Sequence, residues 1–504
     1  MIGKNGFRIF AALLAALILS GLVSCAGDTG GDETTPQPGV QTQAPETTAE
    51  ETGARSSVIP DGLNFGGEEV VMISRSAQGQ KDEFYAEDVS GSLISDSVFA
   101  RNRMTEEKLG ITFKMVLSAD SGAYTISDAL RNAKSTGEHL YDIIANSTYS
   151  TIMYINEGIL RDLTKCEYLD LDAPYWSSGF NRGASIGRSQ YMASGAIALS
   201  MYRYMFVTFF NTKMFESNGR ESLFDTVDRG EWTLDYQIEL SDAFYSDLNG
   251  DLKKDEGDIY GFATNPAVYI DPYWASCDIG IITKDGDDQM VYSLDTERLS
   301  NVLDKVIDLY YKHNSYVGAV DGSDDEYQVR MTKIFSEGRA ATCTIRLLAV
   351  ETEDLRNMAD EYGIVPMPKY DREQSAYRTF LHDQLTGVGI PASVSDEDRF
   401  QMLGAVLEQL AVDSANKVVP DYYDVALKGR YLRNSQSWKM LDLCYESVYI
   451  DPGVLYTKVL GSVHQGIRDI VQSGNNTAVS TYNAKKKLIG IEMKKFQDQV
   501  LALG

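Results

Sequence analysis

One pentapeptide in the chain has the spacing of a serine nucleophile. Gly183, Ser185 and Gly187 form the pattern Gly-x-Ser-x-Gly, which in serine hydrolases puts the serine on a strained turn between a strand and a helix. The flanking segments here, SGFNR and RSQYMASG, are polar and predict a turn that leads into a short strand. We therefore expect no catalytic residue at this motif and no enzyme activity. No two of the four histidines stand at metal-ligand spacing, since they are His139, His313, His382 and His464.

An acidic loop, DLNGDLKKDEGD at residues 247–258, has side-chain oxygens at the spacing of an EF-hand-type calcium loop. Position 6, where such loops have glycine, is Leu252, and position 12 is an aspartate in place of the usual glutamate. A structural calcium is one interpretation and an acidic, solvated turn is the other; no cofactor is required. The candidate ligands, with a main-chain carbonyl at position 7, are Asp247, Asn249, Asp251, Lys253, Asp255 and Asp258.

Polar side chains that follow predicted strands are candidates for binding a small ligand. A sugar ring offers C–H faces for aromatic stacking and hydroxyls for planar polar groups, and the chain has 30 tyrosines and four tryptophans. Open α/β sheets place ligand contacts beyond the carboxyl ends of their strands. The residues at these places are Arg75, Ser76, Asn146, Ser147 and Thr148.

The elements that position these residues alternate between strands and helices, which predicts an α/β fold. One helix has an apolar face from Leu299 to Leu309, and a second has one from Phe400 to Leu410. Ser395 precedes the second helix with Asp398 three residues later, a capping-box pattern. The strand candidates are 69–74, 141–146, 204–211, 340–345 and 386–390.

The first 24 residues have the layout of an export signal. Lys4 and Arg8 precede an apolar run from Ile9 to Leu19 that is too short to span a membrane. The following Leu-Val-Ser-Cys resembles the lipobox of bacterial lipoproteins, which implies that Cys25 carries a diacylglyceryl anchor and, as in such lipoproteins, palmitate. Residues 25–58 have almost no large apolar side chains and predict a disordered tether.

The net charge argues against one class of partner, and the cysteines indicate which covalent links the chain can form. The formal charge of −27 excludes a polyanion such as DNA or RNA. The remaining cysteines are widely scattered, without a CxxC pair. We expect buried free thiols, with a disulfide left open, at Cys166, Cys277, Cys343 and Cys444.

Seven segments follow one another along the chain: SDSVFARNRMTEEKLGITF, YDIIANSTYSTIMYINEGILRDLT, FVTFFNTKMFESNG, EWTLDYQ, FSEGRAATCTI, YGIVPMPKYD and TGVGIPASVSDEDR. In this order they resemble the extracellular solute-binding proteins of carbohydrate-type ABC transporters, the broad family of the maltose-binding protein.

The resemblance implies a type II fold with two lobes joined by hinge crossings and a ligand cleft between them. Lobe one would comprise residues 59–198 and 378–415, lobe two residues 199–377, and residues 416–504 would pack on the hinge and on lobe two. Hinge closure over the ligand would be the signal for the transporter. By the same resemblance, ligand contacts would come from Tyr202, Arg203, Tyr269, Trp274 and Arg346, with Trp176 as a further candidate.

These expectations describe a monomeric, lipid-anchored binding protein on the extracytoplasmic face of the cell membrane. It would capture a small solute, with a sugar as the best fit, and deliver it to the permease of an ABC importer. An exported carbohydrate hydrolase is the alternative, because two carboxyls at the required separation cannot be excluded among 73 acidic residues. A surface adhesin is a third class.

Overall fold

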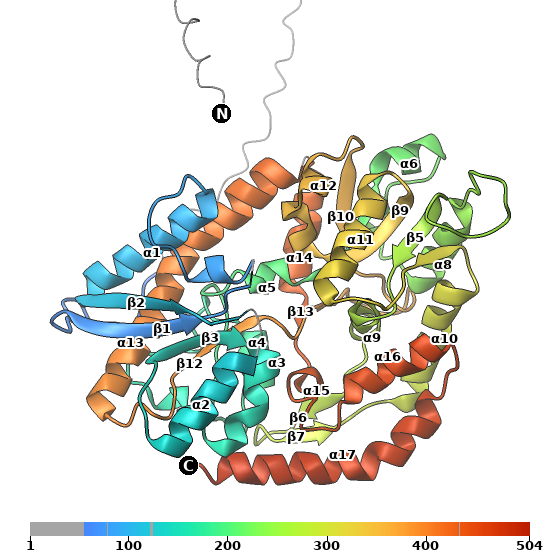
Figure 1. Cartoon of the computed structure of the whole chain (residues 1–504). Helices are drawn as coiled ribbons and strands as arrows, with labels where there is room; N and C mark the ends of the chain where they lie inside the picture. The colour runs from blue at the N-terminus through green and yellow to red at the C-terminus, as the bar shows by residue number, and fades with distance from the viewer. Residues whose placement is uncertain (1–54, 78, 121–123, 433) are drawn as a thin grey trace, which may run out of the picture. The chain divides into compact units, whose positions relative to one another are not determined.

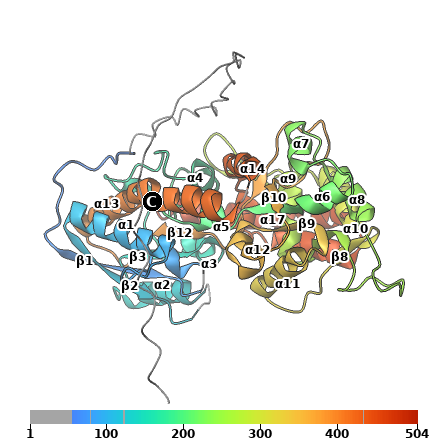
Figure 2. The ribbon, with the colours of Figure 1, turned by 90° about the horizontal axis from the view of Figure 1, so that it is seen from above.

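Two mixed β-sheets form the framework of the described chain. The computed structural model describes residues 55–77, 79–120, 124–432 and 434–504, without the side chains of residues 324 and 325. The first sheet has the strand order β12-β3-β1-β2 and the second has the order β10-β4-β9-β5-β8. The two sheets lie in different halves of this part of the chain (Figures 1 and 2), and we call these halves lobe one and lobe two.

In lobe one, β1 lies parallel to both of its neighbours, and β12 joins antiparallel to β3 from far along the chain. The strands are β1 (Glu68–Ser74), β2 (Ile111–Leu117), β3 (Ile143–Ser147) and β12 (Thr386–Gly389). Helices α1 and α13 pack against each other beside this sheet. The helical segments are η1 (Lys81–Glu83), α1 (Leu93–Leu109), α2 (Tyr124–Thr136), α3 (Thr148–Thr151), η2 (Ile152–Glu157), η3 (Leu163–Lys165), α4 (Ser178–Ala184) and α13 (Glu397–Asp413).

In lobe two, the central strand β9 is buried along its whole length, as expected for a sheet covered on both faces. The strands are β4 (Phe206–Asn211), β5 (Tyr260–Thr264), β8 (Ser315–Val317), β9 (Ala340–Arg346) and β10 (Tyr362–Val365). The helical segments are α5 (Ser200–Arg203), α6 (Thr212–Ser217), α7 (Leu223–Asp228), α8 (Leu234–Ala243), η4 (Val268–Ile270), α9 (Asp271–Ser276), α10 (Thr296–Tyr311), α11 (Asp324–Ser336), η5 (Leu347–Glu351) and α12 (Glu353–Arg356).

The remaining elements connect the lobes or lie beside them. Two further pairs of strands form two-stranded sheets, β6 with β7 and β11 with β13. The strands are β6 (Ile282–Lys284), β7 (Met290–Tyr292), β11 (Thr379–Phe380) and β13 (Val448–Tyr449). The last helices are the π-helices η6 (Ser414–Val418) and η7 (Asp421–Tyr431), then α14 (Ser435–Glu446), α15 (Pro452–Leu455), α16 (Val463–Ser473) and α17 (Ala478–Leu501).

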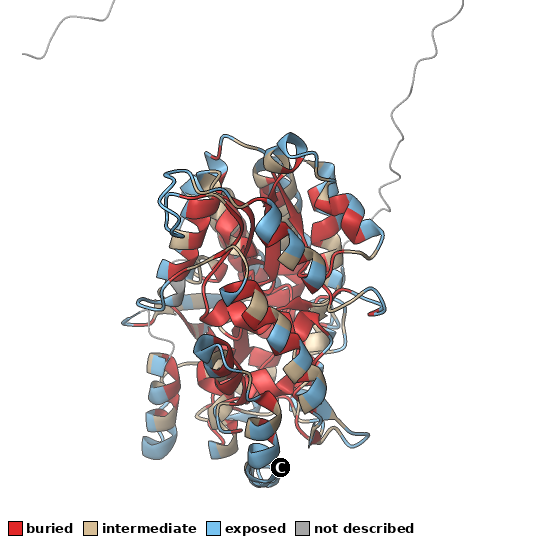
Figure 3. Ribbon diagram, turned by 90° about the vertical axis from the view of Figure 1, so that its right-hand side faces the viewer, coloured by how far each residue is buried: buried red, intermediate tan, exposed pale blue. Residues whose placement is uncertain are grey.

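The C-terminal helix α17 contacts both lobes. It packs on α10 of lobe two and on η2 of lobe one, where Asn156 donates a 2.9 Å hydrogen bond to Gln499. One side of α17 is buried and the other is exposed (Figure 3). The helix therefore bridges the two lobes.

The α/β prediction is confirmed, and all five strand candidates correspond to strands of the two sheets. The predicted cap of α13 is displaced by one residue. The Asp396 carboxylate, in place of the Ser395 hydroxyl, accepts the first hydrogen bond, from the main-chain nitrogen of Arg399 at 2.7 Å. An aspartate at this position also favours the helix dipole, which is positive at the N-terminus.

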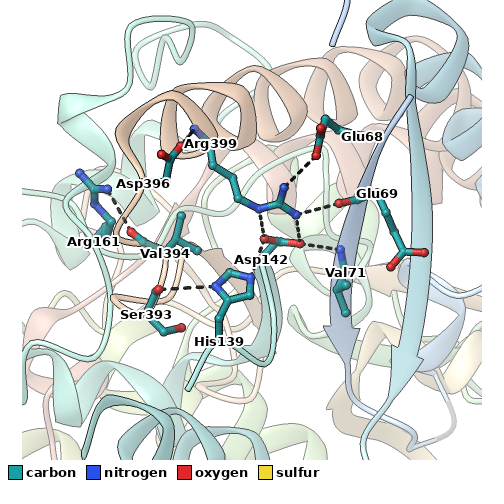
Figure 4. A network of polar contacts seen from close by, with 10 residues as sticks. All are labelled: Glu68, Glu69, Val71, His139, Asp142, Arg161, Ser393, Val394, Asp396 and Arg399. Carbon is teal, nitrogen blue, oxygen red and sulfur yellow. Dashed lines mark hydrogen bonds and ion pairs between the residues drawn. The ribbon is translucent and has the colours of Figure 1, made fainter. Parts of the chain in front are cut away.

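This cap places Arg399 over a buried carboxylate that directly precedes β3, an inner strand of the lobe-one sheet (Figure 4). Asp142 has no exposed side-chain surface and accepts hydrogen bonds from Arg399 Nε at 2.7 Å, Arg399 Nη2 at 2.8 Å and the Val71 main chain at 2.8 Å. Burial by itself raises the pKa of Asp142, but Arg399 and Val71 outweigh it and hold this pKa below its ordinary value. The pair joins the start of α13 to strand β1.

Other predictions concern the N-terminal anchor and tether and the four remaining cysteines. Cys25 and the signal segment lie outside the described residues, while Arg55, near the end of the predicted tether, pairs through its main chain with Asn416 at 2.9 Å. No helix among the described residues has the length and apolarity that a membrane span needs. The four remaining cysteines are buried free thiols, as expected: Cys166, Cys277, Cys343 and Cys444.

Candidate functional site

A cavity of about 170 Å³ lies where both lobes, a hinge crossing and the C-terminal region meet. Lobe one contributes Tyr149, just beyond β3, and lobe two contributes Val268 in η4. The segment between β11 and β12 crosses between the lobes and contributes His382, Asp383 and Gln384. The segment around α15 and α16 adds Thr457, Lys458, Ser462, His464, Gln465 and Arg468.

This convergence distinguishes the cavity from other hollows of the described chain. A larger hollow of about 460 Å³ is lined only by residues of lobe two, among them Glu221, Arg229 and Glu373. Ligand sites occur preferentially between lobes. We therefore take the 170 Å³ cavity as the candidate site.

The crossing segment supplies a neutral histidine beside a carboxylate. The ring of His382 is buried and lies edge-on to Tyr204, with 6.0 Å between ring centres. Burial, together with nearby arginines, lowers the pKa of His382 well below its ordinary value. Its Nδ1 lies 3.6 Å from an Asp383 carboxylate oxygen. The ring is therefore uncharged at neutral pH.

The C-terminal wall contains a second neutral histidine and a paired arginine. Burial lowers the pKa of His464 to about 3, and its Nδ1 lies 2.6 Å from the Thr457 hydroxyl. The Arg468 guanidinium forms an ion pair with the buried Asp271, with 2.8 Å from Nε to Oδ1. Its Nη1 also lies 3.4 Å from Gln465.

The chemistry of the lining suits a polyhydroxylated ring. Asp383, Gln384, Gln465 and Arg468 carry planar polar groups that can each bond two neighbouring hydroxyls. Tyr149 offers a half-buried aromatic ring, the kind of surface on which sugar C–H faces pack. Among the described residues, no group of three or more His, Cys, Asp or Glu side chains could hold a metal ion.

Four of the residues named from the sequence lie directly behind the cavity. The Thr148 hydroxyl donates to the Asp383 carbonyl at 2.8 Å, while the next residue, Tyr149, lines the cavity. The other three are related to the cavity in different ways. Arg75 donates to the Gln384 carbonyl at 2.9 Å, Arg346 lies 5.5 Å from the ring centre of Tyr204, and Tyr269 is the buried neighbour of Val268.

Three predicted residues at the end of β1 and β3 have hydrogen-bonding or packing roles within lobe one. Ser76 donates to the Asp120 carbonyl at 2.7 Å, and Asn146 donates to the Thr151 hydroxyl at 2.9 Å. Ser147 is fully buried in β3. None of the three lines the cavity.

Arg203 and Tyr202 lie on the first crossing, where they connect elements. The Arg203 guanidinium is 1% exposed and forms ion pairs with Asp82 of lobe one at 3.1 Å and Glu351 of lobe two at 2.8 Å. Tyr202 stacks on Tyr445 of α14, with ring centres 4.6 Å apart and 7° between the planes. Both residues hold the lobes and the C-terminal region together, and a ligand contact by either of them stays a prediction.

Both candidate tryptophans are buried in the interior. Trp176 donates from its indole nitrogen to Glu408 of α13 at 3.1 Å, inside lobe one. Trp274 has no exposed surface and packs edge-on against Phe380, with 5.4 Å between ring centres. We assign packing roles to these two indoles.

The loop predicted to bind calcium makes its own hydrogen bonds. Asp247 accepts from the main chain of Gly250 and Leu252, and Asp251 accepts from that of Lys253. Leu252 has φ of +61°, the left-handed conformation in which such loops use glycine. The remaining candidates, Asn249, Asp255 and Asp258, bond to one another or to nearby main chain.

Comparison with known proteins identifies the fold of this chain. No protein-family model matches the chain, and the search of curated proteins found no match. Three solved structures align with most of it. A family 1 extracellular solute-binding protein from Bifidobacterium longum subsp. infantis has a TM-score of 0.52 and 14% identity, covering 87% of this chain and 100% of that chain.

The second is a solute-binding protein of an ABC transporter from Thermotoga lettingae TMO bound to α-D-tagatose (TM-score 0.50, 14% identity, 86% and 100% coverage). The third is a maltose/maltodextrin-binding domain from Bdellovibrio bacteriovorus bound to maltotriose (TM-score 0.50, 13% identity, 86% and 99% coverage). The sheet topology and these alignments together show that the chain has the two-lobed α/β fold of extracellular solute-binding proteins.

Proposed function

We propose that this chain is the substrate-binding component of an ABC importer and that it captures a sugar in the 170 Å³ cavity. The observation that carries the proposal is the convergence of both lobes and a hinge crossing on one set of planar polar side chains. Two proteins of the same fold are bound to sugars in their structures. Closure of the lobes over the sugar would create the surface that the permease recognises.

The side chains that line the cavity favour sugar binding over glycoside hydrolysis. Glycoside hydrolysis requires two carboxyls flanking the scissile bond. Among the described residues that line the cavity, Asp383 is the one carboxylate. The Gly-x-Ser-x-Gly serine does not lie on a strand-to-helix turn, because Ser185 follows helix α4, and its hydroxyl lies 3.0 Å from Asp288.

Calorimetry and small-angle scattering with a panel of sugars test this function. We expect at least one sugar to bind with one-to-one stoichiometry, to raise the midpoint of thermal unfolding and to reduce the radius of gyration. Binding stabilises the folded state by mass action. Compaction with peptides alone would contradict the sugar class, and release of reducing ends from polysaccharides would contradict the binding-protein assignment.

We further propose that Cys25 carries the lipid that keeps the protein on the extracytoplasmic face of the membrane, as a monomer beside its permease. The support is the layout of residues 1–24 and the lipobox-like Leu-Val-Ser-Cys. Labelling with a palmitate analogue should mark the wild type and leave Cys25→Ser unlabelled. A labelled Cys25→Ser protein in the membrane fraction would contradict the anchor.

A structural calcium ion in residues 247–258 also stays a proposal, supported by the oxygen spacing and by the left-handed Leu252. In the structure the carboxylates of this loop accept from its own main chain and form no group that could hold a metal ion, so calcium binding would have to rearrange them. Its role would be to fix a loop of lobe two. Calorimetric titration should show one binding event that Asp247→Ala and Asp251→Ala both remove. A flat titration at millimolar calcium would leave an acidic turn as the correct interpretation.

A further inference from the structure

One arginine uses all of its side-chain donors at the place where the two lobes meet. Arg203 ends helix α5, which lies between the two sheets (Figures 1 and 2), and its side chain is 1% exposed. Its Nε and Nη2 donate to the Glu351 carboxylate of η5 at 2.8 and 3.2 Å. Both elements belong to lobe two, so Glu351 fixes the direction of the guanidinium within that lobe.

The remaining donors of this guanidinium reach lobe one. Arg203 Nη1 donates to the Gly79 carbonyl at 3.0 Å and to Asp82 Oδ1 at 3.1 Å, and Nη2 donates to Asp82 Oδ2 at 3.1 Å. Gly79 and Asp82 lie in the turn of residues 79–83, which follows strand β1 and contains η1. A guanidinium has five N–H groups, and the five hydrogen bonds to the two lobes use all of them.

The turn of residues 79–83 makes further contacts with the first crossing between the lobes. The Glu83 carboxylate accepts a hydrogen bond from the main-chain nitrogen of Ser200 at 2.6 Å, and the Gln80 amide donates to the Tyr204 hydroxyl. Ser200 and Tyr204 lie on either side of Arg203 in the chain. The turn therefore packs on the start of lobe two, and Arg203 adds an ion pair to this contact.

The ion pair between the lobes is partly open to water, so it can break at a moderate cost. The Asp82 side chain is 32% exposed and that of Glu351 is 22% exposed. If the lobes separate at this point, water replaces Asp82 as the partner of the guanidinium, and Glu351 still compensates its charge. The cost of separation is thus well below that of leaving a buried charge without a partner.

We propose that the Asp82–Arg203 ion pair is a latch that favours the arrangement of the two lobes seen in this structure, with Glu351 as the residue that positions Arg203. Opening the latch breaks the three hydrogen bonds to the turn of residues 79–83 and keeps the two to Glu351. The latch would set how much of the unliganded protein has the latched arrangement, and that fraction scales the apparent affinity of a ligand that requires it. The inference concerns the lobe movement on which the proposed function depends, but its test needs no sugar.

Distances between spin labels on the two lobes test the latch. One label is attached through Asp128→Cys, at a position 59% exposed on α2 of lobe one, and the other through Lys333→Cys, at a position 64% exposed on α11 of lobe two. The protein is the chain without its signal segment and with Cys25→Ser, because the other four cysteines are buried. Pulsed electron paramagnetic resonance then gives the populations of the lobe arrangements without sugar.

Asp82→Ala is expected to raise the ratio of open to latched protein by about fivefold or more, because it removes a two-oxygen partner of a charged donor. In the wild type, an increase in salt from about 50 to 500 mM should also favour the open arrangement, since salt screens partly exposed charges. Asp82→Ala should lose this salt dependence. Glu221→Gln removes an exposed ion pair with Arg229 inside lobe two and is the matched control, which should behave as the wild type.

The outcomes separate the latch from sugar capture. Equal label distances in the wild type and Asp82→Ala overturn the latch, and so does an equal change in Glu221→Gln. If Asp82→Ala unfolds at a lower temperature than the wild type, Asp82→Asn, which keeps the shape of the side chain, replaces it, and unchanged distances and salt dependence in that variant overturn the latch. A failure of every sugar to bind in calorimetry overturns the proposed function and leaves the latch standing.

Discussion

Replacing Asp142 with alanine is expected to lower the free energy of unfolding by about 3 kcal/mol, at the lower end of the range for breaking a buried ion pair. The variant removes two hydrogen bonds of the Arg399 guanidinium, which keeps its 3.2 Å contact with Glu68, and leaves the Val71 main-chain nitrogen without its carboxylate acceptor. Because the Arg399 side chain is 26% exposed, water compensates part of the loss. The measurement is the denaturant midpoint of the transition that unfolds lobe one.

The same helix offers a matched control. Arg161 and Glu397 form a 2.7 Å ion pair at the start of α13, but the Glu397 side chain is 62% exposed. Exposed ion pairs contribute about 0 to 1 kcal/mol to stability. The denaturant midpoint of Glu397→Gln should therefore lie close to that of the wild type. Equal denaturant midpoints for Asp142→Ala and Glu397→Gln would contradict the structural role of the buried pair.

The pH dependence of this difference has a defined sign. The folded-state pKa of Asp142 lies below its ordinary value, which is about 3.9 in unfolded chains. The carboxylate therefore contributes its full stabilisation above about pH 4, and the contribution is lost as the pH falls through the folded-state pKa. The gap between wild type and Asp142→Ala should be constant from pH 5 to 7 and should narrow below pH 4.

Several strands could be predicted from the sequence because they are buried on both faces. Ala340–Arg346 and Phe206–Asn211 have no exposed residue, so each appears as a continuous run of β-branched, aromatic and small residues. The order of the family-like segments then predicted two lobes. The π-helices after α13 lack such a signal, because their pattern differs from an α-helix only in hydrogen-bond register.

On two segments the residues predicted from the sequence are direct neighbours of residues that line the candidate cavity. Thr148 was named, and its neighbour Tyr149 lines the cavity; Tyr269 was named, and its neighbour Val268 does so. Successive side chains point in different directions as the chain leaves a strand. A sequence pattern locates the segment, but the direction of each side chain depends on the three-dimensional turn that follows.

The C-terminal wall could not be predicted for a different reason. Contact between Thr457–Arg468 and His382–Gln384 joins segments far apart in the chain, and no local periodicity encodes that proximity. One signal was present in the composition. Two of only four histidines, His382 and His464, face this cavity, although neither spacing nor neighbouring residues linked them.

Trp274→Ala is expected to destabilise the fold by about 3 to 5 kcal/mol, the usual cost of deleting a buried tryptophan side chain. The indole is fully buried and packs against Phe380 on the crossing strand β11. We therefore expect stability to fall first and affinity to fall through displacement of the crossing that carries Asp383.

Two further variants separate packing from ligand contact. Within the described part of the chain the Trp274 indole nitrogen has no hydrogen-bond partner, so Trp274→Phe removes an unsatisfied group and keeps a ring, and should cost only about 1 to 2 kcal/mol.

Tyr149→Ala removes a half-buried ring from the cavity wall and should weaken sugar binding about tenfold, or about 1.4 kcal/mol, with little change in stability. Denaturant midpoints and calorimetric affinities of the three variants provide the comparison. A Trp274→Ala protein that has the denaturant midpoint of the wild type but no longer binds sugar would place the indole in the site and contradict the packing role.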